Sequence, residues 1–297
     1  MVTMIQTITG TTDITLALVL SPIYLRVIYL FISNKKYRSL DSYRIMIQIG
    51  FTQVVYGIAV FIFGVCTVLE ADLFYLGSYG KTFLVTVIRT EVFFSLVLAL
   101  NRAAIMCCLT CPKHLFTVLN LICWLFFLIH FSVFSSPWAS YIMVVGSAMP
   151  SVNVSLPYSI LFNSISGYIY DSMLLCILLT YIIIVTYMAH LHKMQTKRNN
   201  LKSEAKILVY AVIRFLFDSI LSITFHYVHF QKTPLTDFIQ ESAYNLNNMF
   251  VPPLLYLALH SSLRRKFLPK VCRNKSAVAV TVLTSREHIT LHQTRRL

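Results

Sequence analysis

Charged residues are scarce in this sequence of 297 residues. Asp, Glu, Lys and Arg make up only 12% of it, whereas an ordinary soluble domain carries about 25%. Hydrophobic residues make up 57%, and the mean hydropathy is +0.70. These values exclude a soluble enzyme, a disordered chain and a small secreted domain held together by disulfides. They predict a protein that crosses a membrane several times.

Acidic residues are especially few, since 11 Asp and Glu oppose 25 Lys and Arg and leave a formal net charge of +14. The basic residues lie between the apolar stretches and in the C-terminal tail. That distribution is typical of cytoplasmic loops that face anionic lipid, rather than of a surface that binds nucleic acid. We therefore expect membrane lipid, and no nucleic acid, as a partner.

Signatures of catalysis are absent as well. The sequence contains no His-Glu-x-x-His, Gly-x-Ser-x-Gly or P-loop motif. Tyr170-Asp171 is similar to one aspartate motif of intramembrane aspartyl proteases, but the partner motif Gly-x-Gly-Asp is missing, so a site of two carboxylates cannot form. We expect no enzymatic activity, no cofactor and no metal.

Seven apolar stretches approach or exceed the roughly 20 residues that a helix needs to span a bilayer. They run over residues 14–33, 45–69, 83–109, 115–135, 158–188, 205–230 and 238–260. We therefore predict an all-α membrane protein, a bundle of seven transmembrane helices. Because no basic segment or small-residue cleavage site precedes the first stretch, we expect it to be a retained span. Residues 136–156 are expected to form a loop with an apolar patch of its own.

The positions of Lys and Arg predict the orientation of the chain. With the N-terminus outside, 20 of the 25 Lys and Arg residues lie inside, three lie within spans, and only Lys81 and Lys232 lie outside. Cytoplasmic loops are enriched in these residues. The chain is thus divided into an extracellular N-terminus (1–13), a transmembrane domain (14–260) and a cytoplasmic tail (261–297).

Two kinds of covalent modification are predicted. Asn153 begins a glycosylation sequon in the second outer loop. Cys272 follows the basic amphipathic segment 263–267, where palmitoylation would hold that segment on the membrane; an unmodified thiol is the alternative. Three further cysteines form a cluster at the inner end of the third span, for which we favour partial lipidation over zinc binding with His114: Cys107, Cys108 and Cys111. No outer loop offers a partner to Cys66, so no extracellular disulfide is expected.

Charged residues within the expected spans are costly unless they face the bundle interior and are paired. They include Arg26, Arg89, Glu91, Asp171, Arg214 and Asp218. Arg214 and Asp218 are four residues apart on one helix face, so we expect them to form an ion pair. Such residues are candidates for function as well as for holding the bundle together.

Short motifs recur in a characteristic order along the spans. The third span ends in Asn101-Arg102, Trp124 lies in the fourth span, and the seventh reads Pro-Pro-Leu-Leu-Tyr over residues 252–256. The basic segment 263–267 follows as an expected short eighth helix. Together with the start of the second span, residues 43–53, these motifs resemble rhodopsin-like G-protein-coupled receptors. Within that family, the sequence is most similar to the class T and class X serpentine chemoreceptors of nematodes.

Several motifs depart from that family. Residues 77–79 contain no cysteine where a disulfide is usual, and the second outer loop contains none either. The sixth span lacks the Cys-Trp-x-Pro switch, and Pro252 replaces an asparagine. The seventh span has no lysine, which excludes a retinal Schiff base there. These departures put ordinary activation mechanics in question, but not the fold.

The resemblance implies a chemosensory receptor of the plasma membrane, for example of a sensory cilium. Such a receptor binds a small extracellular ligand and activates a heterotrimeric G protein. Asn101 and Arg102 are the implied coupling residues, and Pro252, Pro253 and Tyr256 the implied activation motif. The ligand is expected between the outer halves of the spans, where the candidate contacts are Asn163, Tyr168, Asp171, His226, Tyr227, Tyr244 and Asn245.

Glu91 has two interpretations. Receptors of this family often hold sodium at this depth, which implies an ion held by Glu91 with Gln53 and Asn248. We slightly favour the other interpretation, a salt bridge between Glu91 and Arg26 without an ion, because Arg26 is close in depth and would repel sodium. For Arg102 the alternative to coupling is an arginine that extends to the lipid headgroups.

Two other functions remain open. A seven-span transporter or channel is the first, although a transporter is expected to contain repeated halves or matched helix breaks, and the sequence shows no repeat. The second is a receptor-like protein that no longer signals, which the altered motifs would suit.

Overall fold

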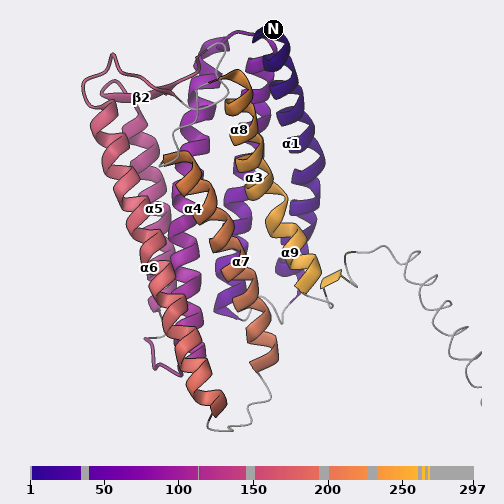
Figure 1. Cartoon of the computed structure of the whole chain (residues 1–297), viewed down its shortest axis with the longest axis vertical. Coiled ribbons are helices and arrows are strands. Elements are labelled where there is room, and N and C mark those ends of the chain that lie inside the picture. The colour runs from indigo at the N-terminus through magenta and orange to yellow at the C-terminus, as the bar shows by residue number, and fades with distance from the viewer. Residues whose placement is uncertain are drawn as a thin grey trace, which may run out of the picture.

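The computed structural model describes residues 2–34, 40–112, 114–144, 151–193, 201–226 and 233–259, together with Leu263, Arg264 and Phe267. These residues form a tall bundle of helices with a small β-sheet at one end (Figure 1). The N-terminus lies at the same end as the sheet, which we call the upper end. The fold is therefore mostly helical, as the sequence predicts.

Eight α-helices make up the described bundle. They are α1 (Val2–Ser33), α3 (Asp41–Val68), α4 (Leu76–Met106), α5 (Leu115–Phe134), α6 (Ser159–Lys193), α7 (Leu201–His226), α8 (Pro234–Met249) and α9 (Val251–Leu259). A short 3-10 helix, η1 (Leu73–Tyr75), leads into α4. Helices α1, α3, α4, α5 and α6 are long and apolar enough to cross a membrane. They coincide with the first five predicted spans; α7 and the α8–α9 pair overlap the other two, so the count of seven stays a prediction.

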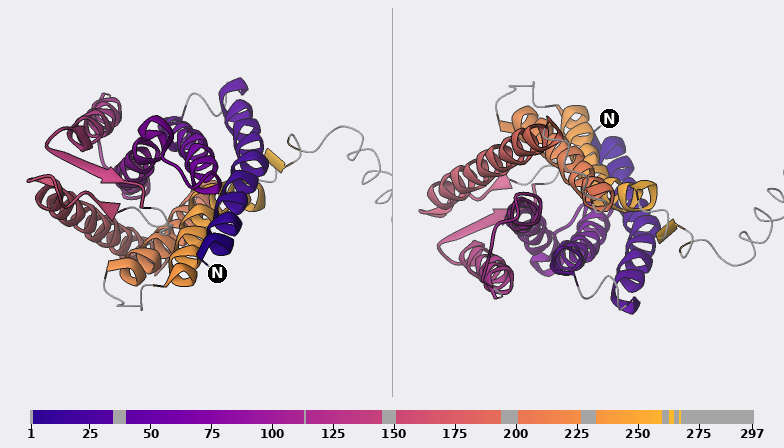
Figure 2. Two further views of the ribbon diagram at one scale, coloured as in Figure 1. Left: turned by 90° about the horizontal axis from the view of Figure 1, so that it is seen from above. Right: turned by 90° about the horizontal axis from the view of Figure 1, so that it is seen from below.

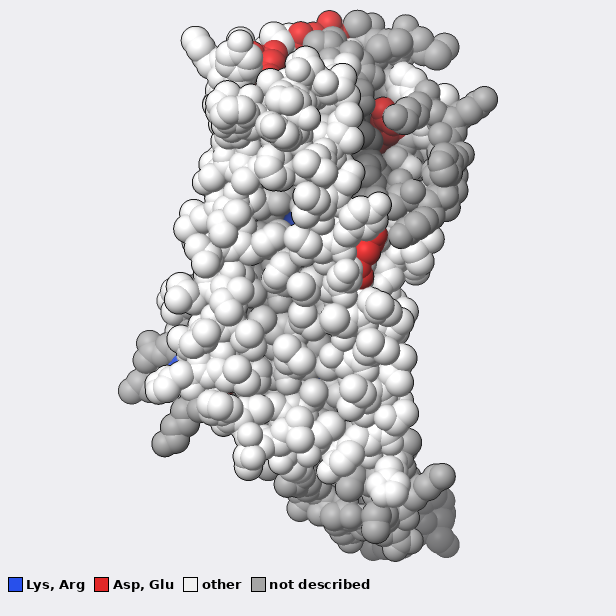
Figure 3. All heavy atoms as spheres, turned by 90° about the vertical axis from the view of Figure 1, so that its left-hand side faces the viewer, with Lys and Arg blue, Asp and Glu red and all other residues white. Residues whose placement is uncertain are grey.

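Apolar side chains cover the outside of the bundle. On α5, for example, Leu121, Leu125 and Leu128 are all exposed. The face on the left of Figure 1, near α5 and α6, shows few charged side chains over most of its length (Figure 3). Exposing such a large apolar surface to water would be unfavourable, whereas lipid tails are as apolar as the leucines. The surface therefore fits a membrane environment.

Helix α4 lies at the centre of the bundle and packs against α3, α5, α6 and α7. Its Phe94 is fully buried in a cluster with Ile45 of α3 and Ile177 of α6. The same helix carries Lys81 and Arg102 into the interior. Because buried charges must be paired or hydrogen-bonded, the partners of α4 are set by electrostatics as well as by packing.

Helix α1 begins at Val2, whereas the sequence predicts a first span from residue 14. The intervening residues are rich in threonine, and their hydroxyls bond to the helix's own backbone. Thr9 Oγ1 donates to the Ile5 carbonyl at 2.8 Å, and Thr11 Oγ1 donates to the Thr7 carbonyl at 2.7 Å. These bonds satisfy the hydroxyls within the helix. The segment that the sequence assigns to an extracellular N-terminus is thus an upward extension of α1.

The connection between α5 and α6 contains a small antiparallel sheet, where the sequence predicts a loop with an apolar patch. Its strands, in the order β1-β2-β3, are β1 (Ser135–Ser136), β2 (Ala139–Ile142) and β3 (Ser151–Val152). Tyr141 lies opposite Val152 and packs on Phe134 at the end of α5. Seen along the bundle axis, the strands lie beside α5 and α6 (Figure 2). The apolar patch thus packs against α4, α5 and α6 near their upper ends.

The last predicted span is broken into two helices. Thr233 caps α8 in a capping box with Thr236. The helix ends at Met249, and α9 starts at Val251. Pro252 and Pro253 lack the N–H groups that a continuous helix would use at these positions. The proline pair thus accounts for the break, although the sequence predicts one continuous span over residues 238–260.

Candidate functional site

A cavity of about 400 Å³ opens within the upper half of the bundle. Helices α3, α4, α6 and α8 form its walls, and the sheet contributes Tyr141 and Val152. Small-molecule sites usually have volumes of about 300–1,000 Å³. The lining is rich in tyrosine and ionisable side chains: Tyr56, Lys81, Arg89, Tyr141, Tyr168, Tyr170, Asp171, Glu241 and Tyr244.

Five of the seven predicted ligand contacts line this cavity. They are Asn163, Tyr168, Asp171, Tyr244 and Asn245. Tyr227 and the side chain of His226 lie outside the described residues. Residues from α6 and α8, which are far apart in the sequence, thus meet at one cavity.

Lys81 is the main residue that the sequence interpretation misplaced. We expected it outside the membrane, yet its side chain is buried inside the bundle, on α4. Its Nζ lies 2.9 Å from Oε1 of Glu241 on α8 and 3.2 Å from the ring centroid of Phe63 on α3. Burial of a lysine is tolerated because the carboxylate and the ring face compensate its charge. The available signal was Glu241, an acid in the predicted seventh span for which we named no partner.

A second chain of hydrogen bonds runs beside this ion pair. Asn245 Nδ2 donates to Oδ1 of Asp13 on α1 at 2.8 Å. Tyr56 Oη on α3 donates to Oδ1 of Asn245 at 2.6 Å. Oδ2 of Asp13 and Oε2 of Glu241 accept no hydrogen bond from the described residues. The cluster joins α1, α3, α4 and α8 around two carboxylates and one ammonium group.

Arg89 also lines the cavity, about two turns after Lys81 on α4. Its Nη2 donates to Oδ1 of Asn163 on α6 at 2.9 Å, and its Nη1 contacts Nε2 of His130 on α5 at 3.2 Å. Tyr141 Oη also donates to Asn163 Oδ1, at 2.8 Å. Burial raises the pKa of Tyr141 to about 12, so its hydroxyl keeps the proton that it donates. The sheet is thereby tied to the helix that carries Arg89 and to α6.

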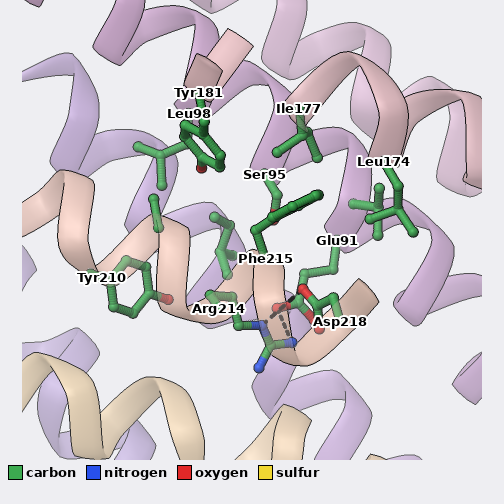
Figure 4. A pocket seen from close by; sticks show the side chains of 13 residues that line it. Glu91, Ser95, Leu98, Leu174, Ile177, Tyr181, Tyr210, Arg214, Phe215 and Asp218 are labelled. Atoms are coloured by element: carbon green, nitrogen blue, oxygen red, sulfur yellow. Dashed lines mark hydrogen bonds and ion pairs between the residues drawn. The ribbon is translucent and has the colours of Figure 1, made fainter. Parts of the chain in front are cut away.

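A second network of buried polar groups includes Glu91, Arg214 and Asp218, which point toward one another in Figure 4. At its centre, Arg214 of α7 forms ion pairs with Glu91 (Nη2–Oε1, 2.8 Å) and Asp218 (Nε–Oδ2, 3.2 Å). Its Nη2 also donates to Oδ1 of Asn248 at 2.7 Å, and its Nη1 donates to the Asn247 carbonyl. Arg214 thus connects three helices, and the expected pair with Asp218 is only one part of its contacts.

Gln53 joins the same network, but Arg26 does not. Gln53 Nε2 donates to Oε2 of Glu91. Arg26 is exposed on α1, with its guanidinium carbon 5.5 Å from the ring centroid of Tyr29. The expected Glu91–Arg26 salt bridge is therefore wrong, because Arg26 points to the outside of the bundle while Arg214 reaches Glu91 from α7.

Two cavities of about 10 Å³ each touch the network. Glu91, Arg214 and Asp218 line both. Each has room for about one water molecule. Among the described residues there is no group of three or more His, Cys, Asp or Glu that could hold a metal ion. Sodium binding at Glu91 stays a prediction.

Arg102 lies near the lower end of α4 and is only 1% exposed. Its side chain is therefore inside the bundle and does not extend to the lipid headgroups, as the alternative interpretation required. The neighbouring Asn101 accepts a hydrogen bond at Oδ1 from Ser42 Oγ of α3 at 2.5 Å. This bond fixes the end of α4 against the start of α3.

The remaining motif residues pack within the bundle. Tyr256 of α9 is buried, stacks on Tyr210 of α7 at 4.6 Å between ring centroids, and meets the edge of Phe31. Trp124 of α5 donates to Oε1 of Gln48 on α3 at 3.0 Å. Pro252 and Pro253, which precede Tyr256 in α9, are buried. Asn153 directly follows β3, whereas Cys272 lies outside the described residues.

Comparisons with known proteins identify the fold. No protein-family model matches the sequence, and no curated protein matches it. The crystal structure of squid rhodopsin is similar to this structure with a TM-score of 0.71, and the likeness covers 89% of this chain and 84% of that chain at 13% sequence identity. At such low identity the likeness establishes the fold alone. The chain has the fold of squid rhodopsin, a G-protein-coupled receptor.

Proposed function

We propose that this protein is a chemosensory G-protein-coupled receptor of the plasma membrane. In this proposal α1, α3, α4, α5, α6, α7 and the α8–α9 pair are seven spans, with the N-terminus outside. A small extracellular ligand binds in the 400 Å³ cavity, and a heterotrimeric G protein binds at the lower end. The observation that carries the proposal is a cavity of ligand size at the upper end of a rhodopsin-like fold.

The course of α4 supports a connection between the two ends. Arg89 lines the cavity, Glu91 belongs to the Arg214 network, and Arg102 is buried near the lower end. At 1.5 Å per residue, Arg89 and Arg102 are about 20 Å apart along one helix. A ligand that shifts α4 at Arg89 would therefore also bias the ion pairs at Glu91 and the position of Arg102.

We assign the protein to the nematode serpentine chemoreceptors of class T or X, on the strength of Asn101-Arg102 and the segment 252–256. The eighth helix is proposed to begin at residue 263. Leu263 is buried and Phe267 packs against the main core cluster, which supports an apolar face turned toward the bundle. Glycosylation of Asn153 and palmitoylation of Cys272 belong to the same proposal.

Nucleotide exchange on a co-expressed G protein, measured beside membrane current, tests this function. A panel of small molecules that stimulates exchange without current supports the receptor. Current without exchange would instead show a channel. A protein that reaches the surface and binds members of the panel, yet produces neither signal, would be a receptor-like protein that does not signal.

Gly167 provides a variant that tests the cavity itself. It lines the cavity, and a Cβ added there meets no atom within 4 Å. Gly167→Leu should place a side chain in the cavity while improving the helix propensity of α6. We expect loss of ligand-stimulated exchange with normal surface expression. Ser172→Leu on the exposed side of the same helix is the matched control and should respond normally.

A further inference from the structure

Arg89 is a cation whose hydrogen-bond partners in the described structure are neutral. An arginine can only donate hydrogen bonds, so Nε2 of His130 must accept the one from Nη1. The imidazole is then neutral, with its proton on Nδ1, which lies 2.8 Å from Oγ1 of Thr86. The other partner, Asn163, is an uncharged amide that accepts from Nη2. Neither contact supplies a negative charge to the guanidinium.

Asp171, Glu241 and Glu91 are the acidic residues that could form an ion pair with Arg89, and none of them does so in the described structure. Asp171 lines the same cavity and its charge attracts Arg89, but no hydrogen bond or ion pair joins the two side chains. Oδ1 of Asp171 instead accepts a hydrogen bond from Ser222 Oγ of α7 at 3.4 Å. Glu241 is paired with Lys81 across the cavity. Glu91 is paired with Arg214. Within the described part of the chain, no ion pair neutralises Arg89.

The geometry leaves the guanidinium able to bind an anion. It has five N–H groups in a planar fork, and two hydrogen bonds account for its contacts to His130 and Asn163. The fork matches the two oxygens of a carboxylate. A charge in a low-dielectric interior is stabilised when an opposite charge pairs with it. Because Arg89 lines the cavity, that charge can come from a ligand.

We infer that the cavity binds a small organic carboxylate, whose oxygens accept hydrogen bonds from Arg89. This inference rests on the proposed function of the cavity and specifies the class of its ligand. Leu84, Val85 and Ile88 of α4 line the same space, and Gly167 leaves it open on the α6 side. A short hydrocarbon chain fits these surfaces, so the ligand is a short-chain monocarboxylate.

Thermal unfolding of the purified full-length protein in detergent tests the inference without a signalling partner. Cys66 and Cys123 are buried, so a thiol-reactive dye reports their exposure on unfolding. The probes are straight-chain carboxylates of four to eight carbons, the primary amides of the same lengths and the corresponding primary amines. Carboxylates should raise the melting temperature in a concentration-dependent manner, because they bind the folded state. The amides, which have the same shape without the charge, should not.

Two variants locate the effect at Arg89. Arg89→Gln should weaken carboxylate binding about 10- to 100-fold, the loss expected for a charge-assisted hydrogen bond. Asn163→Asp keeps Arg89 and the cavity shape but supplies an internal carboxylate, so it should weaken binding similarly. Arg26→Gln removes an arginine from the exposed face of α1 and is the matched control. It should bind carboxylates like the parent.

Several results would overturn the inference. Equal stabilisation by amides and carboxylates, or unchanged carboxylate binding in both variants, would show that Arg89 does not recognise an anion. Stabilisation by amines alone would assign the cavity to cations at Glu241, and no stabilisation by any carboxylate would remove this ligand class. The proposed receptor function would survive each of these results if another compound stimulated nucleotide exchange in the parent but not in Gly167→Leu.

Discussion

Nη2 of Arg214 lies 2.8 Å from Oε1 of Glu91, although the two residues are 123 positions apart in the sequence. This ion pair joins α7 to the central helix α4. The same guanidinium also binds Asp218 on its own helix and the backbone of α8 at Asn247. One arginine thereby connects α4, α7 and α8. It is also the cation that compensates the buried carboxylates of Glu91 and Asp218.

Removal of Arg214 should destabilise the protein more than removal of either carboxylate. Arg214→Met leaves Glu91 and Asp218 buried without a cation, and we expect a loss of about 3–5 kcal/mol in the free energy of unfolding. Asp218→Asn should cost less, because Glu91 still pairs with Arg214. Melting temperature and surface expression give the measurement.

A double-mutant cycle tests whether Arg214, Asp218 and Glu91 are energetically coupled or contribute to stability independently. Arg214→Gln with Asp218→Asn should recover only part of the loss, because Glu91 then lacks a cation. Adding Glu91→Gln should recover more. Strictly additive losses in the cycle would argue against coupling among the three residues.

Lys81 and Glu241 should behave as a pair. Lys81→Met leaves two carboxylates, Glu241 and Asp13, without their cation, so we expect lower thermal stability and poor surface expression. The double variant with Glu241→Gln should recover part of the loss, because Asp13 still lacks its cation. Lys81→Arg is the control that keeps the positive charge. Because a guanidinium is larger than an ammonium group, this variant should pack less well against Phe63 and lose a little thermal stability. If Lys81→Met melts like the parent, the pair does not stabilise the bundle.

The proposed orientation predicts glycan on Asn153. Expression in a secretory system should give a glycosylated protein whose apparent mass falls after glycosidase treatment and in Asn153→Gln. Asn274→Gln, at a sequon in the tail that the proposal places in the cytoplasm, should leave the mass unchanged. A tag after Leu297 should be labelled only in permeabilised cells. Labelling of that tag on intact cells would reverse the orientation.

Arg102 should be needed for coupling. Its side chain is buried, so Arg102→Lys should not restore function merely by keeping a charge at the membrane surface. At matched surface expression, Arg102→Lys and Arg102→Ala should both reduce nucleotide exchange strongly, because an ammonium cannot reproduce the planar fork. Ligand binding in the cavity should persist. Normal exchange in Arg102→Ala would exclude Arg102 as the coupling residue.

The sequence was sufficient for features that depend on local pattern. Apolar runs of about 20 residues predict membrane helices, and the first five predicted runs coincide with helices that could cross a membrane. A spacing of four residues brings Arg214 and Asp218 onto one helix face, and the ion pair is present. The break between α8 and α9, by contrast, was not predicted, since residues 238–260 read as one apolar run.

The tertiary structure decided which distant charges meet. The sequence predicts Lys81 outside the membrane, before the third span, but the packing of the bundle brings its Nζ within 2.9 Å of Glu241 on α8. Depth in the membrane suggested Arg26 as the partner of Glu91, yet Arg26 is exposed on α1, and Arg214 reaches Glu91 from α7. Helix rotation depends on the fit of all neighbouring side chains, which no single stretch of sequence contains. For that reason the two uncharged hydrogen-bond partners of Arg89, His130 and Asn163, come together only when α4, α5 and α6 are assembled.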